Sequence, residues 1–281
     1  MILSGTIGYF VLESGQPPVN VVFARCVVGS LCLLAYCLRT RRFAASAFGT
    51  KNLALLAVVG LAIVGNWLAL FAAYRYATIG VATTIYHVQP FIVFFAGALM
   101  FGERIGAARL AWLVAAFVGV VLIAEPQAAA VTAGYLRGCA LAIAAAALYA
   151  VATLASKRIE AVPPHVIALA QMLVGVLTLA PFADFAELPA TAWQWNCLLI
   201  LGVVHSAFMY ILIYAAYLKL PTSTIAILSY LYPLVAVLVD YLAYGHVLAP
   251  LQMLGGALIL CAGLAGTLDF NPLKPRPKTR A

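Results

Sequence analysis

Two stretches of this sequence place polar side chains just before a proline in the middle of an apolar run. The polar residues are Thr83, His87 and Gln89 in the first stretch, and Tyr230 and Tyr232 in the second. A polar group inside hydrocarbon is costly unless it faces a cavity or a partner, so each is a candidate functional residue. An imidazole, an amide and two phenols can bind the amino, carboxyl or ring parts of a small metabolite. The alternative is a structural hydrogen bond to a neighbouring helix.

The two prolines, Pro90 and Pro233, are candidates for hinges. Proline cannot donate a backbone hydrogen bond and therefore bends a helix and frees a carbonyl group one turn earlier, near Tyr86 and Ser229 respectively. We expect the two bent helices to bring their polar residues toward one central volume.

A third group of polar side chains is aromatic. Ser206, Tyr210, Tyr214 and Tyr217 recur at spacings of four, four and three, which places them on one face of a helix. Tyr149 belongs to a similar polar seam in an earlier apolar run. Such a stripe can line a cavity, but aromatic residues at this spacing also pack against other helices or lie at the membrane interface, and both interpretations stay open.

Three ionisable residues inside apolar runs are candidates for ion pairing or proton coupling, namely Arg25, His205 and Asp240. Arg25 could pair with a carboxylate or a substrate anion, or have a structural role. Asp240 is a candidate for a gate or proton-sensitive site, against the alternative of a snorkelled or hydrogen-bonded carboxylate. Imidazole titrates in the physiological range, so coupling through a histidine such as His205 or His87 is chemically reasonable.

The sequence contains no pattern typical of an enzyme or a metalloprotein. There is no Ser/His/Asp constellation, no pair of carboxylates, no HExxH motif and no phosphate-binding glycine loop. The six cysteines have no CxxC or Cys/His spacing that would suit a metal. We therefore expect no catalytic residue, no metal and no cofactor.

The elements that carry these residues are predicted to be membrane-spanning helices. The 281 residues are 66% hydrophobic and 9% charged, whereas a soluble domain is about half apolar and about a quarter charged. A span needs about 20 apolar residues, and a closed barrel would alternate apolar and polar positions instead. The predicted helices are 1–14, 18–38, 52–74, 78–101, 106–124, 134–155, 164–183, 195–217, 222–244 and 250–268. The first is short, so either it is tilted or the true start lies upstream.

The basic residues at the ends of these runs predict the orientation in the membrane. One set of alternate loops and ends holds Arg39, Arg41, Arg42, Lys51, Arg104, Arg109, Lys157, Arg158, Lys219, Lys274, Arg276, Lys278 and Arg280. The opposite set holds Arg75 and Arg137. Because Lys and Arg are enriched on the cytoplasmic side, both termini are predicted to be cytoplasmic. The formal charge of +8 is thus a topology signal, and no nucleic-acid partner is expected.

The two proline-containing stretches belong to an internal repeat. A shift of 143 residues places the segment 71–74 (FAAY) on 214–217 (YAAY), Pro90 on Pro233, and Phe101-Gly102 on Tyr244-Gly245. The shift also places His87 on Tyr230 and Gln89 on Tyr232. Because it covers five predicted helices, an odd number, the second copy is expected to be inverted. Inverted repeats suit alternating access around a site at the midplane.

Three features of the first copy stand out, namely Pro17-Pro18 leading to Arg25, Tyr74, and the stretch from Thr83 to Arg104 with its mid-helix proline and terminal Gly-Glu-Arg. In these features the sequence resembles the EamA-type, ten-span members of the drug/metabolite transporter superfamily. The second copy has Gly245-His246-Val247 in place of that terminus. The resemblance implies one repeat over 1–124, an inverted repeat over 134–268, and a basic cytoplasmic tail over 269–281.

The functional hypothesis is a multi-pass transporter in the bacterial inner membrane whose partners are the lipid bilayer and a small-molecule solute. The resemblance implies export of amino acids or related compounds. Uptake or facilitated exchange by the same fold is one alternative, and a non-transporting sensor or assembly protein is another. A homodimer is left open by the sequence.

Overall fold

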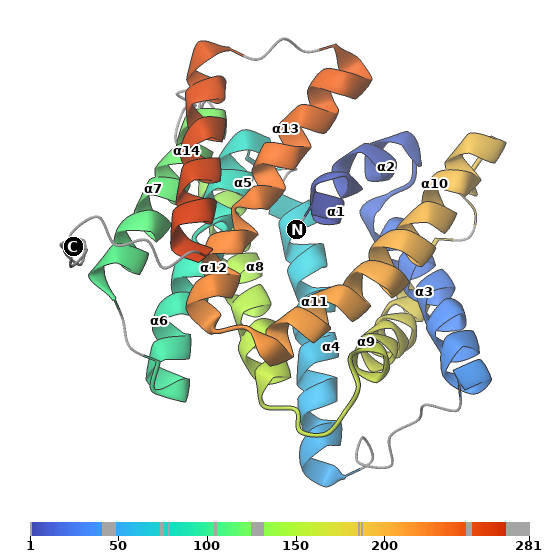
Figure 1. Ribbon diagram of the computed structural model, residues 1–281. Helices are drawn as coiled ribbons and strands as arrows, with labels where there is room; N and C mark the ends of the chain where they lie inside the picture. The colour runs from blue at the N-terminus through green and yellow to red at the C-terminus, as the bar shows by residue number, and fades with distance from the viewer. Residues whose placement is uncertain are drawn as a thin grey trace, which may run out of the picture.

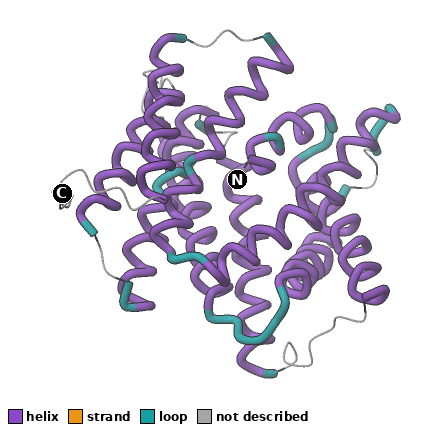
Figure 2. The backbone as a smooth tube through the Cα atoms, in the orientation of Figure 1, coloured by secondary structure: helices purple, strands orange, loops and turns teal. Residues whose placement is uncertain are grey.

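The computed structural model describes residues 2–40, 49–73, 76–77, 79–103, 106–124, 132–184, 186, 188–245 and 249–267. Within them the fold is all-helical, without strands, and short loops join the helices (Figures 1 and 2). The α-helices are α1 (Ile2–Gly5), α2 (Ile7–Glu13), α3 (Pro18–Thr40), α4 (Thr50–Ala73), α5 (Ile79–Tyr86), α6 (Gln89–Phe101), α7 (Ala107–Ala124), α8 (Ala133–Lys157), α9 (Pro164–Leu179), α10 (Ala192–Gly202), α11 (Met209–Lys219), α12 (Thr222–Ser229), α13 (Leu231–Tyr244) and α14 (Pro250–Thr267). The all-α expectation is confirmed for this part of the chain.

Seven helical segments of the described residues are long and apolar enough to cross a membrane, and three shorter apolar helices accompany them. The expected ten full-length spans are therefore not confirmed. Ile2–Glu13 is one of the short helices. At a rise of 1.5 Å per residue it extends about 18 Å, less than the hydrocarbon core of about 30 Å.

Two helices that the sequence predicts as continuous are interrupted three residues before a proline. The 78–101 run breaks at His87 and Val88, and the 222–244 run breaks at Tyr230. At both breaks the backbone N–H bonds three residues back, as Val88 to the Ile85 carbonyl at 3.0 Å and Tyr230 to the Ile227 carbonyl at 3.2 Å. Proline explains this geometry, since it lacks the N–H that would continue the ladder and its ring crowds the preceding turn.

The two proline-containing helices also end alike. Gly102 follows α6 with φ 66° and Gly245 follows α13 with φ 71°. This left-handed conformation carries almost no steric cost for glycine and terminates a helix by turning the chain away. The two segments that match in sequence thus share both a break and an end.

The predicted helix 195–217 contains an irregularity that no sequence pattern indicated. A π-helical turn, Val203–Phe208, joins α10 to α11. An extra residue in one turn rotates the following positions relative to an α-helix, and such turns are frequent at functional sites. The first helix is likewise divided, at Thr6 between α1 and α2.

The interior contains two main clusters of buried apolar side chains. One joins α3, α4, α8, α9 and α11, and the other joins α6, α7, α12 and α14. α4 packs on α8, α3 on α9, and α14 on α7, while α1 lies against α13 near the middle of the view (Figure 1). Large side chains such as Leu99 and Leu242 are exposed on the outside, as lipid-facing positions of a membrane bundle should be.

Some positions used in the sequence predictions lie outside the described residues. They are Arg41, Arg42, Tyr74, Arg75, Arg104, His246, Val247 and the tail 269–281. The backbone of Asp240 lies in α13, but its side chain is also outside the description.

Candidate solute-binding cavity

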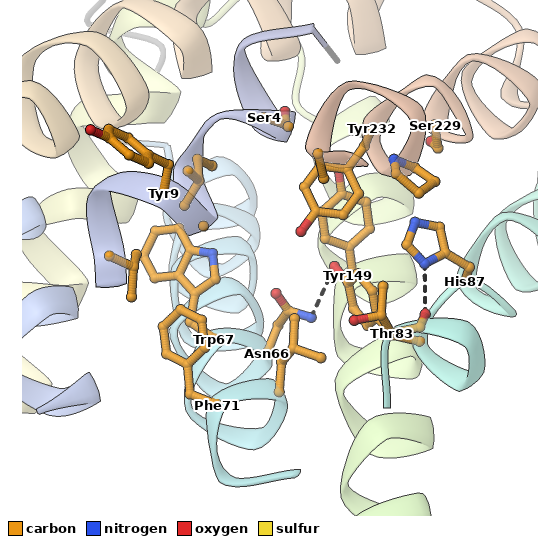
Figure 3. A pocket seen from close by; sticks show the side chains of 18 of the residues that line it. Ser4, Tyr9, Asn66, Trp67, Phe71, Thr83, His87, Tyr149, Ser229 and Tyr232 are labelled. Atoms are coloured by element: carbon orange, nitrogen blue, oxygen red, sulfur yellow. Dashed lines mark hydrogen bonds between the residues drawn. The ribbon is translucent and has the colours of Figure 1, made fainter. Parts of the chain in front are cut away.

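A cavity of about 770 Å³ lies between the helices of the two apolar clusters (Figure 3). Its polar and aromatic lining residues are Ser4, Tyr9, Gln16, Arg25, Asn66, Trp67, Phe71, Thr83, Tyr86, His87, Gln89, Tyr149, Tyr210, Ser229 and Tyr232. The volume falls within the range of small-molecule sites, which is about 300–1,000 Å³. Helices from both halves of the chain contribute to it.

His87 occupies the break between α5 and α6. Its Nδ1 donates to the Thr83 carbonyl oxygen at 2.6 Å (Figure 3). Because a carbonyl can only accept, Nδ1 carries the proton, and in the neutral ring Nε2 is left as an acceptor. The imidazole lies nearly parallel to the Tyr232 ring at 5.6 Å and to the Tyr230 ring at 6.1 Å. The helix break and the two tyrosines thus fix the direction of the imidazole.

Tyr230 itself is fully buried and does not line the cavity. Its hydroxyl donates to the His87 carbonyl oxygen at 3.0 Å. This bond joins the break in the first proline helix to the break in the second, across 143 residues of sequence. Tyr230 therefore supports the cavity wall from behind.

Asn66 is a buried polar residue in the middle of α4. Its amide nitrogen donates to the Ala145 carbonyl oxygen at 2.7 Å and approaches the Tyr86 hydroxyl at 3.4 Å (Figure 3). The contacts connect α4 with α8 and α5. Asn66 was not singled out from the sequence, although a lone Asn within a strongly apolar run is the kind of signal that would have found it.

Arg25 lies on α3 with 1% of its surface exposed. Its Nε donates to the Ser206 hydroxyl at 3.1 Å, and its guanidinium carbon lies 4.6 Å from the centroid of the Trp67 ring. The π-helical turn supplies Ser206, whose hydroxyl in turn donates to the Leu201 carbonyl at 2.8 Å. Arg25 is thus held by an aromatic face and a hydroxyl, and its Nη2 has no hydrogen-bond partner.

A layer of tyrosine hydrogen bonds adjoins the cavity. The Tyr149 and Tyr217 hydroxyls are 2.6 Å apart, and the Tyr214 hydroxyl donates to the Gln171 side-chain oxygen. Of these four residues only Tyr149 lines the cavity. Tyr214 and Tyr217 belong to the large buried cluster.

α12 packs against α6, and its first residue is bound by Glu103, which follows α6. The Glu103 carboxylate accepts hydrogen bonds from the Thr222 backbone N–H at 3.0 Å and from its hydroxyl at 2.7 Å. Burial alone would raise the pKa of Glu103, but these bonds and the nearby Lys157 ammonium lower it below its ordinary value. A carboxylate at the first turn of α12 also suits the helix dipole. We call this contact the Glu103–Thr222 latch.

The candidate site residues predicted from the sequence fall into three sets. Those that line the cavity are Arg25, Thr83, His87, Gln89, Tyr149, Tyr210, Tyr232 and Pro233. Those that lie outside its lining are Pro90, His205, Tyr214 and Tyr230. The Nε2 atom of His205 instead lies 2.7 Å from the hydroxyl of Thr6, between α1 and α2. The third set is Asp240 alone, whose side chain lies outside the described part of the structure.

No group of three or more His, Cys, Asp or Glu side chains that could hold a metal occurs among the described residues. The cysteines in that part of the chain are all unpaired thiols.

Comparison with known proteins agrees with this architecture. The model of the EamA-like transporter family matches residues 2–124 and 136–267. The uncharacterized transporter YxxF of Bacillus subtilis is 28% identical over 95% of this chain and 86% of its own length. The threonine/homoserine exporter RhtA of Escherichia coli K12 is 27% identical over 92% of this chain and 83% of its own.

A third relative, the pseudopaline exporter CntI of Pseudomonas aeruginosa strain UCBPP-PA14, is 26% identical over 89% of this chain and 86% of its own length. A protein crystal structure shares the fold with a TM-score of 0.80 and 23% identity, over 95% of this chain and 94% of that one. The two family matches cover nearly all the described helices. The chain is therefore a multi-pass membrane transporter that belongs to the EamA-like transporter family.

Proposed function

We propose that this transporter exports amino acids or related small polar metabolites across the bacterial inner membrane by alternating access. The observation that carries the proposal is the cavity, because side chains from both family matches line it. Asn66 and His87 come from the first match, and Tyr149 and Tyr232 from the second. Export is supported by the relatives RhtA and CntI, which are described as exporters.

We further propose that the two matched segments are inverted five-helix repeats with both termini in the cytoplasm. The proposal is supported by the shared breaks before Pro90 and Pro233 and the shared left-handed glycines Gly102 and Gly245. One fold in two orientations has two asymmetric states of similar energy, so a solute can be exposed first to one side and then to the other. Pro90 and Pro233 are proposed as the hinges.

The residues proposed to contact the solute are the polar members of the lining, with His87 at the centre. Its Nε2 is an acceptor in the neutral ring, because Nδ1 is bound to the Thr83 carbonyl. Proton coupling through His87, His205 or Asp240 is a separate proposal. It predicts that an imposed pH gradient changes the transport rate.

The experiment is counterflow in proteoliposomes loaded with unlabelled solutes from a panel of amino acids, small organic acids, amines and nucleosides. Labelled solute is then added outside. Export or exchange predicts that it accumulates inside the vesicles as the loaded, unlabelled solute leaves. No counterflow of any member would refute the transport proposal. In that case, binding without flux would instead support a sensor. If a solute does exchange, flux that is unaffected by a pH gradient would indicate facilitated exchange.

A further inference from the structure

Arg25 is a buried cation that has no anionic partner among the residues described by the structure. No Asp or Glu of the described part of the chain forms an ion pair with it, and its Nη2 makes no hydrogen bond. Buried charges in membrane proteins normally pair with each other or with backbone carbonyls, because an unpaired charge in a low dielectric is costly. Since the described residues supply no anion to Arg25, an anion from outside the chain, such as a solute, can pair with it.

The surroundings of Arg25 connect it to the solute cavity. Arg25, Trp67 and Tyr210 all line it, and the described lining includes no Asp or Glu. The one formal charge among these described lining side chains is therefore positive. A cavity of this kind, with low-dielectric walls, concentrates negatively charged groups.

The guanidinium is held in a fixed orientation. The Ser206 hydroxyl accepts from Nε, and the Trp67 ring covers one face at 4.6 Å. Since the Ser206 hydrogen is already donated to the Leu201 carbonyl, the lone pair of the hydroxyl is directed to Arg25. These contacts use Nε and a face of the group, and they leave the Nη2 hydrogens unused. A guanidinium fixed in this way matches the planar geometry of a carboxylate better than a lysine ammonium would.

We propose that Arg25 binds the carboxylate of the transported solute, which is therefore a small organic acid, amino acids included. Ser206 and Trp67 are positioning residues that hold the guanidinium. This proposal rests on the transport function proposed above and specifies the chemical class of its solute. Neutral or cationic metabolites that lack a carboxylate leave Arg25 unpaired and are excluded on that ground.

The rest of the cavity suits the remainder of such a solute. Tyr86, Tyr149 and Tyr232 offer aromatic surface to its carbon skeleton. The unpartnered Nε2 of Gln89 is a donor, and Nε2 of neutral His87 is an acceptor, so hydroxyl or amino substituents can also be bound. Binding of the carboxylate at Arg25 would set the orientation of these groups.

The test compares pairs of solutes that differ only in the carboxylate, namely L-threonine with L-threoninol and L-phenylalanine with L-phenylalaninol. The full chain, purified in detergent, is titrated with each solute while its melting temperature is followed, because a bound ligand stabilises the folded state by mass action. We expect at least one acid to bind about 10-fold or more tightly than its alcohol, as for a polar site that rejects the analogue lacking its partner.

The variants assign that preference to Arg25. Arg25→Gln should abolish the preference for the acid, Arg25→Lys should keep part of it, and Ser206→Ala should weaken acid binding several-fold. Arg137→Gln removes an exposed arginine outside the cavity lining and should behave as the wild type. If Arg25→Gln does not give a monodisperse protein, the acid-to-alcohol ratio of the wild type and of Ser206→Ala decides.

The proposal is overturned if alcohols bind the wild type as tightly as acids, or if folded Arg25→Gln retains the full acid preference. Either result leaves transport itself intact, because counterflow of an amino acid, an amino alcohol or another solute without a carboxylate would still be observed in proteoliposomes. Failure of the transport proposal is different, since no solute of any charge class would then show counterflow.

Discussion

The Glu103–Thr222 latch is the contact whose removal should most directly loosen the start of α12. Glu103 follows α6, and its carboxylate accepts hydrogen bonds from the first residue of α12 at 3.0 and 2.7 Å. Thr222 is fully buried, so few waters can replace the lost acceptor. The substitution Glu103→Ala removes the acceptor and leaves the Thr222 N–H and hydroxyl without it.

The magnitude follows from what Glu103 does for α12. Loss of a side-chain acceptor at a helix N-terminus costs about 0.5–2 kcal/mol, and the charge of the acceptor argues for the upper part of this range. The Glu103 residue is partly exposed, which reduces the value by solvent screening. We expect about 1–1.5 kcal/mol, which corresponds to an increase of about 5- to 12-fold in the population of the locally open state.

Amide hydrogen exchange measured by mass spectrometry reports this population for each segment. In Glu103→Ala, the amides of α12 (Thr222–Ser229) should exchange about 5- to 12-fold faster than in the wild type. Thr191→Ala is the matched control, because Thr191 caps α10 through the backbone N–H of Gln194 at 3.2 Å. It should accelerate exchange in the first turn of α10 and leave α12 unchanged.

Exchange of α12 at the wild-type rate in a folded Glu103→Ala protein would refute this role of Glu103. Equal acceleration of α12 by both variants would also contradict it, because that pattern would indicate general destabilisation. If the latch is broken in the alternative transport state, Glu103→Ala should in addition shift the protein toward that state.

Three further predictions follow from individual contacts. The pKa of Glu103 is lowered in the folded protein, so its stabilising effect is complete above the ordinary glutamate pKa of about 4.3 and is lost as pH falls through the lowered pKa; the ratio of α12 exchange rates in Glu103→Gln and wild type should therefore approach one at low pH. Gly97→Ala would place a methyl group 2.4 to 2.6 Å from atoms of the Thr222 side chain and should destabilise the protein by about 1–3 kcal/mol. The loss should be measured as a lower melting temperature in detergent. In the control Gly8→Ala the added methyl group meets nothing within 4 Å, so the melting temperature should not fall. Asn66→Ala removes the 2.7 Å bond to the Ala145 carbonyl and should cost about 0.5–2 kcal/mol, with faster exchange in α4 and α8; an unchanged melting temperature would show that water replaces the amide.

The sequence alone was sufficient to predict an all-helical membrane protein and most helix positions. Hydrocarbon offers no hydrogen-bond partners, so a chain that is 66% hydrophobic has to satisfy its backbone within helices. The same argument marked the polar residues as interior, and Arg25, His87 and Gln89 are indeed buried. The proline rule predicted bends near Tyr86 and Ser229, next to the breaks observed at His87 and Tyr230, because the effect of proline on the preceding turn is local.

Only the tertiary structure decided which interior polar residues meet. Tyr210 lines the cavity whereas Tyr214, four residues later, bonds to Gln171 outside the lining, although both fall on one face of a regular helix. Both tyrosines lie in α11, so the helices packed around each position decide which one reaches the cavity, and these neighbours have no signal in the local sequence. Likewise Arg25 and Ser206 are 181 residues apart, and their contact depends on how α3 packs against the π-helical turn at Val203–Phe208. Periodicity predicts which residues share one face of a helix. The rotation and depth of that helix in the bundle are set by its packing against the other helices.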